Sequence, residues 1–115
     1  AAAAALDTLG IGFLELREPG PDGTFGNTEV PKQSPAIRRA FKGPLILNSD
    51  YDVAKAEAAL ASGVADAIAF GRPFIGNPDL VERIRSGAAW AADNPQTWYS
   101  AGPEGYTDYP ALVAA

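Results

Sequence analysis

Two short polar loops carry the kinds of residue that bind a phosphate group. Asn48-Ser49-Asp50 follows one apolar run of strand type, and Gly71-Arg72 follows another. Backbone N–H groups at a strand end, a helix N-terminus and a guanidinium group all attract a dianion, because each offers hydrogen-bond donors or positive charge. The small glycine also lets the backbone approach a ligand closely. These residue types predict that the two loops bind the phosphate of a small molecule.

The stretch between these loops has the pattern of a helix that joins two parallel strands. The N-cap is Asp52, and the terminating glycine is Gly63. Between them, three apolar residues lie on one face of the helix: Val53, Ala56 and Leu60. Consecutive strands joined by a helix in this way present their carboxyl ends at the same edge of a sheet. We therefore expect both loops to bind the same anion.

A further strand and two further helices complete the pattern. Residues 11–16 form an apolar strand, and Ser34-Pro35 supplies an N-cap followed by a proline at the first helical position. Asn77-Pro78 repeats that signal before a helix that ends at Gly87. The apolar side chains expected on the inner face of this last helix are Leu80, Val81 and Ile84. The run 45–47 is apolar without alternation, which is typical of a parallel strand covered on both sides.

The fold class predicted from this order of elements is α/β. Three parallel strands alone would leave both edges of the sheet unpaired, whereas a closed (β/α)8 barrel contains eight strand–helix units over roughly 250 residues. We therefore interpret residues 6–112 as the C-terminal three βα units, strands 6 to 8, of a TIM barrel that another chain or a missing segment completes. The alanine-rich ends, 1–5 and 113–115, are left unassigned.

The composition narrows the choice of partner and chemistry. The 115 residues are 47% hydrophobic and 20% charged, which suits one globular domain, and the formal net charge is −5. This charge, without a basic block, argues against a nucleic acid or an anionic membrane surface, and the absence of a long apolar stretch or a signal peptide favours the cytoplasm. The chain has no cysteine and no histidine, so we expect neither a thiolate nucleophile nor a metal site.

Two longer signatures connect the chain to a known family. Residues 66–80, Asp-Ala-Ile-Ala-Phe-Gly-Arg-Pro-Phe-Ile-Gly-Asn-Pro-Asp-Leu, and residues 104–110, Glu-Gly-Tyr-Thr-Asp-Tyr-Pro, together with the loop at 47–51, resemble the C-terminal part of the Old Yellow Enzyme family. These enzymes are FMN-dependent ene-reductases related to N-ethylmaleimide reductase and xenobiotic reductases. The resemblance covers nearly the whole chain but only the final third of a family member.

The resemblance implies a role for each of the residues singled out above. The loop of Asn48, Ser49 and Asp50 and the pair Gly71-Arg72 would bind the FMN phosphate, with the Arg72 guanidinium on its oxygens. Phe70 would contact the edge of the flavin ring or fill the barrel interior. Tyr106 would line the substrate side of the flavin.

The same resemblance implies that the chain contains no catalytic residue. In this family the catalytic groups come from earlier strands. They are the pair that polarises the substrate carbonyl, usually His-His or His-Asn, and the tyrosine that protonates the alkene. The predicted function is therefore the FMN-anchoring segment of an NAD(P)H-dependent reductase of activated C=C bonds, such as enones, maleimides, nitroalkenes or nitro esters. The partner would be the N-terminal barrel portion, without which the chain would be inactive. The alternatives are the phosphate-binding part of another TIM-barrel enzyme and a non-catalytic half-barrel that acts as an interaction module.

Other polar and aromatic residues have simpler interpretations. Glu15, Arg17 and Glu18 are expected to form an internal ion pair that braces the following loop, rather than a catalytic group. Arg83, like other charged residues on the predicted helices, is expected on a solvated face. The remaining aromatic residues of the turn-rich C-terminal segment are expected to pack against the protein rather than to react, and they are Trp98, Tyr99 and Tyr109.

Overall fold

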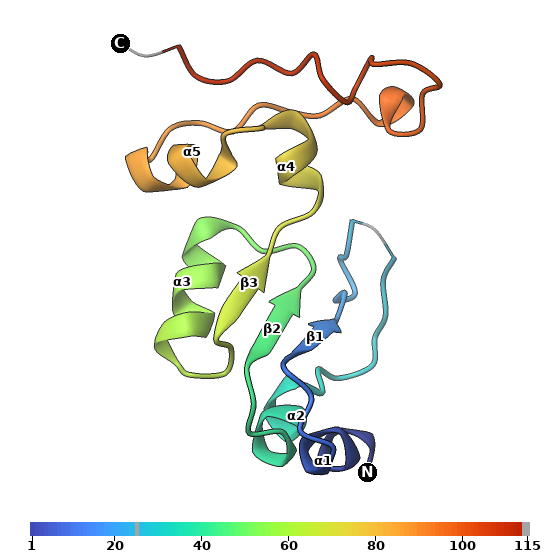
Figure 1. The fold of residues 1–115 in the computed structure, drawn as a ribbon, viewed down its shortest axis with the longest axis vertical. Helices are drawn as coiled ribbons and strands as arrows, with labels where there is room; N and C mark the ends of the chain where they lie inside the picture. Colours follow the sequence, from blue (N-terminus) through green and yellow to red (C-terminus); the bar gives the residue numbers. More distant parts are fainter. Residues whose placement is uncertain (25, 114–115) are drawn as a thin grey trace. The chain divides into compact units, whose positions relative to one another are not determined.

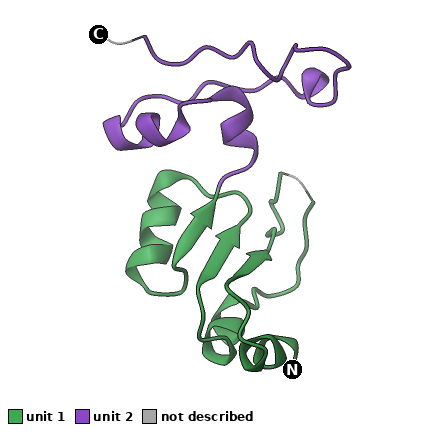
Figure 2. Cartoon of the chain, in the orientation of Figure 1, with its two compact units in different colours: residues 1–69 green, residues 70–115 purple. Residues whose placement is uncertain are grey.

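The computed structural model describes residues 1–24 and 26–113. The chain divides into two compact units, Ala1–Ala69 and Phe70–Ala115, which are coloured separately in Figure 2. The first unit contains the helices α1 (Ala2–Thr8), α2 (Ser34–Ala40) and α3 (Val53–Ala61) and the only sheet of the described chain (Figure 1). The second unit contains α4 (Arg72–Gly76), α5 (Leu80–Ser86) and the 3-10 helix η1 (Pro95–Thr97). None of the helices in the described residues has the length and apolar character needed to cross a membrane.

The sheet has three strands, β1 (Leu14–Arg17), β2 (Leu45–Asn48) and β3 (Ala67–Ala69), in the order β1-β2-β3. Both pairings are parallel, with Leu14 opposite Leu45 and Ile46 opposite Ala67. The predicted α/β pattern of parallel strands in sequence order is thus confirmed. The first strand begins later than predicted from the apolar run 11–16.

One face of β2 forms the centre of the core. Leu45 and Leu47 are buried, whereas Ile46 and Asn48, which point to the other face, are only partly covered. Leu45 and Leu47 pack with Ala59 of α3 and with Ala65. The prediction that this strand is covered on both sides is therefore wrong for the chain by itself. Leucines at alternate positions place their side chains on the single face that α3 covers.

Helix α2 forms where predicted, but it is capped differently. Ser34 is the first residue of the helix, and the N-cap is Gln33, whose side chain makes no capping hydrogen bond. Instead, Glu18 Oε1 accepts hydrogen bonds from the backbone N–H groups of Gln33 and Ser34. A carboxylate distant in sequence thus binds the donors at the start of the helix, which suits the partial positive charge there.

Helix α3 has the predicted ends and a different buried face. Asp52 accepts a hydrogen bond of 2.7 Å from the backbone N–H of Lys55, and Gly63 follows the helix with φ +74°. The buried positions are Ala56 and Ala59, whereas Leu60 is exposed. The prediction for Leu60 is wrong because the two alanines face the sheet, and the large side chain lies at the border of that face.

The second unit contains a buried asparagine where the sequence predicted a helix cap. Asn77 is fully buried, and its side chain donates to the backbone carbonyls of Pro73 and Ala91 and accepts from the Ala91 N–H. It therefore joins α4 to a later segment, and Asp79 takes the N-cap position of α5. On α5, Leu80 is buried as predicted, but Val81 is exposed. Gly87 ends the helix with a left-handed conformation, as predicted.

An ion pair in the first unit leads to a pH-dependent prediction. Arg38 Nη1 lies 2.6 Å from Asp66 Oδ2, and the Leu45 backbone N–H donates to the same oxygen at 2.8 Å. The hydrogen bond from Leu45, followed by the one from Arg38, lowers the pKa of Asp66 below its usual 3.8. A pKa that is lower in the folded state gives stability that is present above the unfolded-state pKa and is lost as the pH falls through the folded-state pKa.

We therefore expect the Asp66→Asn variant to be less stable than the wild type at neutral pH. Its free energy of unfolding should also decrease less than that of the wild type when the pH is lowered from neutral to below about 3.8. The measurement is the urea midpoint of unfolding as a function of pH. Parallel pH profiles for the variant and the wild type would contradict the prediction.

Candidate functional site

The loop after β2 turns sharply at two residues that are not glycine. Ser49 has φ 105° and Asp50 has φ 55°, both in the left-handed region that most side chains avoid. Such conformations cost free energy and are found at ligand sites more often than elsewhere. Their occurrence directly after Asn48, the last residue of β2, marks this loop as a candidate site.

The hydroxyl group of Ser49 is the most informative atom of the loop. Ser49 Oγ is buried and has no hydrogen-bond partner among the described residues, 1–24 and 26–113. A buried polar atom without a partner is rare in proteins and costs about 1–3 kcal/mol. The loop therefore holds a donor that a bound acceptor, such as a phosphate oxygen, would satisfy.

The side chains on either side of Ser49 are bound to other parts of the first unit. Asn48 Nδ2 donates to Glu15 Oε1 at 2.9 Å, while Asp50 accepts hydrogen bonds from the backbone N–H and the hydroxyl of Thr24. The carboxylate of Asp50 therefore holds the loop in place, and only its backbone is suited to an anion. Glu15 therefore binds a neutral amide of this loop, and the ion pair predicted among Glu15, Arg17 and Glu18 stays a prediction.

Tyr51 follows this loop and remains a neutral side chain. Burial of its ring raises the pKa of the hydroxyl, and the negative charge of Glu18 raises it further. At neutral pH the hydroxyl is thus protonated and is suited to donate a hydrogen bond rather than to act as a base.

In the second unit, Gly71 and Arg72 lie at the start of α4. Gly71 is the N-cap, with φ −93°, and a side-chain carbon built on it would meet open space. Neither the backbone nor the neighbouring atoms therefore require a glycine at this position. Arg72 is the first helical residue and is partly buried. The arrangement leaves room for a ligand next to the backbone of Gly71.

Phe70 packs within the second unit. Its ring meets that of Trp90 edge to face, with centroids 5.8 Å apart and an angle of 88°. This geometry is favourable for aromatic pairs and supports the packing interpretation of Phe70. Trp90 was not singled out in the sequence, because nothing in its spacing indicates a partner twenty residues away.

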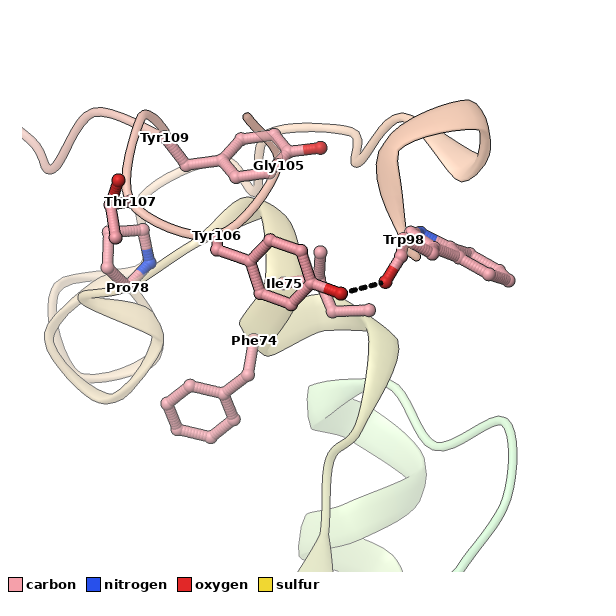
Figure 3. Close-up of a pocket in the computed structure, with 8 residues that line it drawn as sticks. All are labelled: Phe74, Ile75, Pro78, Trp98, Gly105, Tyr106, Thr107 and Tyr109. Atoms are coloured by element: carbon pink, nitrogen blue, oxygen red, sulfur yellow. Dashed lines mark hydrogen bonds between the residues drawn. The ribbon is translucent and has the colours of Figure 1, made fainter. Parts of the chain in front are cut away.

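Tyr106 lines a pocket of about 280 Å³ in the second unit (Figure 3). Tyr106 as a residue is 59% exposed, and its hydroxyl donates to the backbone carbonyl of Trp98 at 2.9 Å. The other lining residues are largely apolar and come from α4, from the turn after it and from the C-terminal segment: Phe74, Ile75, Pro78, Trp98, Gly105, Thr107 and Tyr109. An aromatic wall with a few hydroxyl groups suits a small, partly apolar molecule.

The other aromatic residues of the C-terminal segment differ in their surroundings. The Tyr109 hydroxyl accepts a hydrogen bond of 2.7 Å from the Asn94 N–H, and Trp98 Nε1 donates to Asp93. Both are partly buried, in agreement with their predicted packing role. Tyr99 is 86% exposed, so the same prediction is wrong for Tyr99 within this chain.

The predicted site residues thus fall into two groups. The first group is one loop of the first unit, formed by Asn48, Ser49 and Asp50. The second group lies in the second unit and consists of the consecutive residues 70–72 and of Tyr106, which lines the pocket. Among residues 1–24 and 26–113 there is no cluster of carboxylates suited to a metal ion.

Comparison with known proteins identifies similar sequences. A profile of the NADH:flavin oxidoreductase / NADH oxidase family matches residues 2–90. A putative 12-oxophytodienoate reductase 12 from Oryza sativa subsp. japonica is 42% identical over 96 residues, covering 82% of this chain and 24% of that protein. A probable flavin mononucleotide-dependent alkene reductase from Leishmania infantum is 40% identical over 73 residues, covering 64% of this chain and 20% of that protein.

Similar solved structures lead to the same group of proteins. An old yellow enzyme homologue from Zymomonas mobilis matches with a TM-score of 0.94 and 58% identity, over 96% of this chain and 31% of its own. Morphinone reductase matches with a TM-score of 0.86 and 46% identity, over 96% of this chain and 29% of its own. The chain therefore spans less than a third of the length of each of these proteins.

Proposed function

The chain belongs to the NADH:flavin oxidoreductase / NADH oxidase family, and from this membership we propose that it anchors FMN in an NAD(P)H-dependent ene-reductase. It would do so as the C-terminal part of a TIM barrel. Strands β1 to β3 of this chain would then correspond to strands 6 to 8 of the complete barrel. The chain covers less than a third of these relatives, which supports its being one part of such a barrel. The first and last strands of the sheet, β1 and β3, would pair with the remaining strands of the barrel, because an unpaired edge exposes backbone hydrogen-bonding groups.

The observation that carries the proposal is the buried, unpartnered hydroxyl of Ser49 in the strained loop after β2. FMN carries a phosphate dianion, and hydrogen bonds to charged groups are among the stronger ones in proteins. Ser49 Oγ and the backbone of the loop would donate to that phosphate. The negative side chain of Asp50 is held by Thr24, which keeps the charge of the carboxylate engaged elsewhere.

The second predicted loop, Gly71-Arg72, would also serve the cofactor. Family membership supports this role, because the resemblance on which it rests assigns both residues to the FMN phosphate. The guanidinium of Arg72 offers the planar pair of donors that a phosphate accepts.

The residues of this chain would bind and orient rather than react. The chemistry that FMN supplies when bound is hydride transfer, from NAD(P)H to the β-carbon of an alkene conjugated to a carbonyl or nitro group. Tyr106 and the apolar wall of its pocket would contact the alkene and exclude water. The names of two relatives, a flavin mononucleotide-dependent alkene reductase and a morphinone reductase solved with tetrahydroNAD, support the cofactor and the reductant.

The experiment that tests the proposal uses the complete barrel, meaning this chain together with the remaining βα units, either its own or those of the Zymomonas mobilis relative. We expect a yellow protein with flavin absorbance that reduces an enone at the expense of NADPH. A colourless barrel whose melting temperature does not respond to FMN would contradict the proposal. Such a result would favour another phosphate-binding barrel enzyme or a non-catalytic half-barrel.

A substitution at Ser49 makes the test specific to this loop. We expect Ser49→Ala to weaken FMN binding by about 1.5 kcal/mol, because the phosphate loses one donor. The same substitution should stabilise the FMN-free protein by about 1 kcal/mol, because it removes a buried polar atom that has no partner there. FMN titration and urea unfolding without FMN measure the two effects.

Ser62→Ala is the matched control for this substitution. The hydroxyl of Ser62 already donates to the Ala59 carbonyl at 3.0 Å, so its removal should not stabilise the protein or affect FMN. A loss of stability in FMN-free Ser49→Ala would show that Ser49 Oγ has a partner within the protein.

A further inference from the structure

A buried arginine in the second unit has a role that the proposed function does not use. Arg83 is only 7% exposed, although it was expected on a solvated helix face. Its guanidinium donates to Asp79 Oδ1 at 2.8 Å, to the Ala89 carbonyl at 2.8 Å and to the Pro110 carbonyl at 3.4 Å. A planar group with several fixed donors holds each of these partners in a defined direction.

Asp79 extends this arrangement to the C-terminal segment. Its second oxygen, Oδ2, accepts a hydrogen bond of 2.7 Å from the backbone N–H of Leu112. The bond from Arg83, followed by the one from Leu112, lowers the pKa of the Asp79 carboxyl, so this carboxyl group is charged at neutral pH. Asp79 and Arg83 together thus bind the backbone at both Pro110 and Leu112.

The same segment is fixed at its other end by a glycine. Gly105 has φ +80°, and a side-chain carbon there would lie 2.4 Å from Thr97 Oγ1. Its backbone N–H donates to Asp108 Oδ1 at 2.8 Å. The chain between Gly105 and Pro110, which includes Tyr106, is therefore held at one end by close contact with η1 and at the other by α5.

The position of the Tyr106 ring depends on these two ends. Tyr106 is an exposed residue, and its hydroxyl bonds to the backbone of Trp98. Because neighbouring atoms enclose less than half of the residue, the path of the backbone between the two fixed ends determines where the ring lies. Release of one end would move the wall of the pocket in Figure 3.

We propose that Asp79 and Arg83 are positioning residues, which hold the 105–112 segment so that Tyr106 meets the substrate correctly. This inference rests on the proposed function, because it takes Tyr106 as a wall of the substrate site. The pair acts through the backbone of the segment. A displacement of about 1 Å at a reacting group can reduce the rate by about a hundredfold, so a small change in the segment has a large effect.

The test compares Arg83→Met with Arg85→Met in the complete barrel. Arg85 lies on the same helix and forms an exposed ion pair with Glu82, so its removal changes the charge equally without touching the segment. Three quantities are measured: amide hydrogen exchange of residues 105–112, flavin content, and kcat and KM for 2-cyclohexenone. For Arg83→Met we expect faster exchange, unchanged flavin content and a fall in kcat/KM of about tenfold or more.

Two further variants keep the test decisive. Arg83→Lys should recover part of kcat/KM, because an ammonium group reaches Asp79 but cannot bind both carbonyls at once. Asp79→Asn, which keeps the shape of the side chain, replaces Arg83→Met if that protein does not fold. It should show the same combination of faster exchange at Leu112 and lower kcat/KM.

The outcomes separate the inference from the proposed function. Faster exchange with unchanged kcat/KM would overturn the inference, because the pair would then be structural only. Unchanged exchange, or loss of flavin in the variant, would overturn it as well. Absence of flavin from the wild-type barrel would instead overturn the proposed function. The role of Asp79 and Arg83 in positioning Tyr106 at the substrate would then be overturned as well.

Discussion

Replacement of Arg72 by alanine should weaken FMN binding in the complete barrel by about 1.5–3 kcal/mol, or roughly ten- to a hundredfold in Kd. The expected loss is this large because a guanidinium group donates two parallel hydrogen bonds to a phosphate and also neutralises its charge. Arg72 begins α4 directly after Gly71, whose surroundings leave space for a ligand. The measurement is FMN titration of the flavin-free protein by fluorescence quenching.

Two controls identify the cause of the loss. Arg72→Lys keeps the charge but not the planar pair of donors, so its affinity should lie between those of the wild type and Arg72→Ala. Arg85→Ala removes the same charge from an exposed position on α5 and should leave the affinity unchanged. Equal FMN affinity in Arg72→Ala and the wild type would remove Arg72 from the site.

Replacement of Leu45 by alanine should have the largest effect on stability, a loss of about 2–5 kcal/mol in the free energy of unfolding. Leu45 has no exposed surface and lies at the centre of the core cluster with Leu47, Ala59 and Ala65. Alanine at this position would leave a cavity that the strands on either side of β2 cannot fill without breaking their pairing.

Leu60→Ala provides the comparison for this prediction. Leu60 lies on α3 and is 40% exposed, so its truncation removes less buried apolar surface and should cost less than about 2 kcal/mol. The urea midpoints of the two variants give the measurement. Similar losses for Leu45→Ala and Leu60→Ala would mean that the core is not centred on β2.

The order and direction of the strands could be predicted because they depend on local patterns. The apolar run at β2 and the helix signals from Asp52 to Gly63 are contained in the sequence of the elements themselves. Parallel strands need a crossover connection, which is usually a helix, so a strand, a helix and a strand in this order favour a parallel pair. The sequence therefore indicated that Asn48 and Ala69 would lie at one edge of the sheet, as their pairing shows.

The helix caps were predicted less well, because capping partners can come from distant residues. Asp52 caps α3 through a residue three positions on, which the sequence can show. Glu18 caps α2 from fifteen residues away, and the side chain of Asn77 bonds to Ala91 instead of capping the helix that follows. Ser34 and Asn77 had the correct residue types for caps, but tertiary contacts determined their roles.

The burial of Arg83 and the backbone conformation of Ser49 show the same limit of sequence-based prediction. The burial of Arg83 depends on the carbonyls of Ala89 and Pro110, whose positions no periodicity indicates. The one available signal was the spacing of Asp79 and Arg83, four residues apart on a helix. The left-handed conformation of Ser49 is likewise a property of the folded loop, since serine does not favour it by itself.

The carboxylate of Glu18 has a practical consequence for protein engineering. Because it binds the N–H groups of Gln33 and Ser34, both ends of the intervening loop are fastened at one place. Within that loop, Thr24 is attached to the rest of the unit through Asp50, and Lys32 lies over the Tyr51 ring. Residues 26–31 are thus suited to replacement by other loop sequences, while Glu18, Thr24 and Lys32 keep the ends of the loop in place.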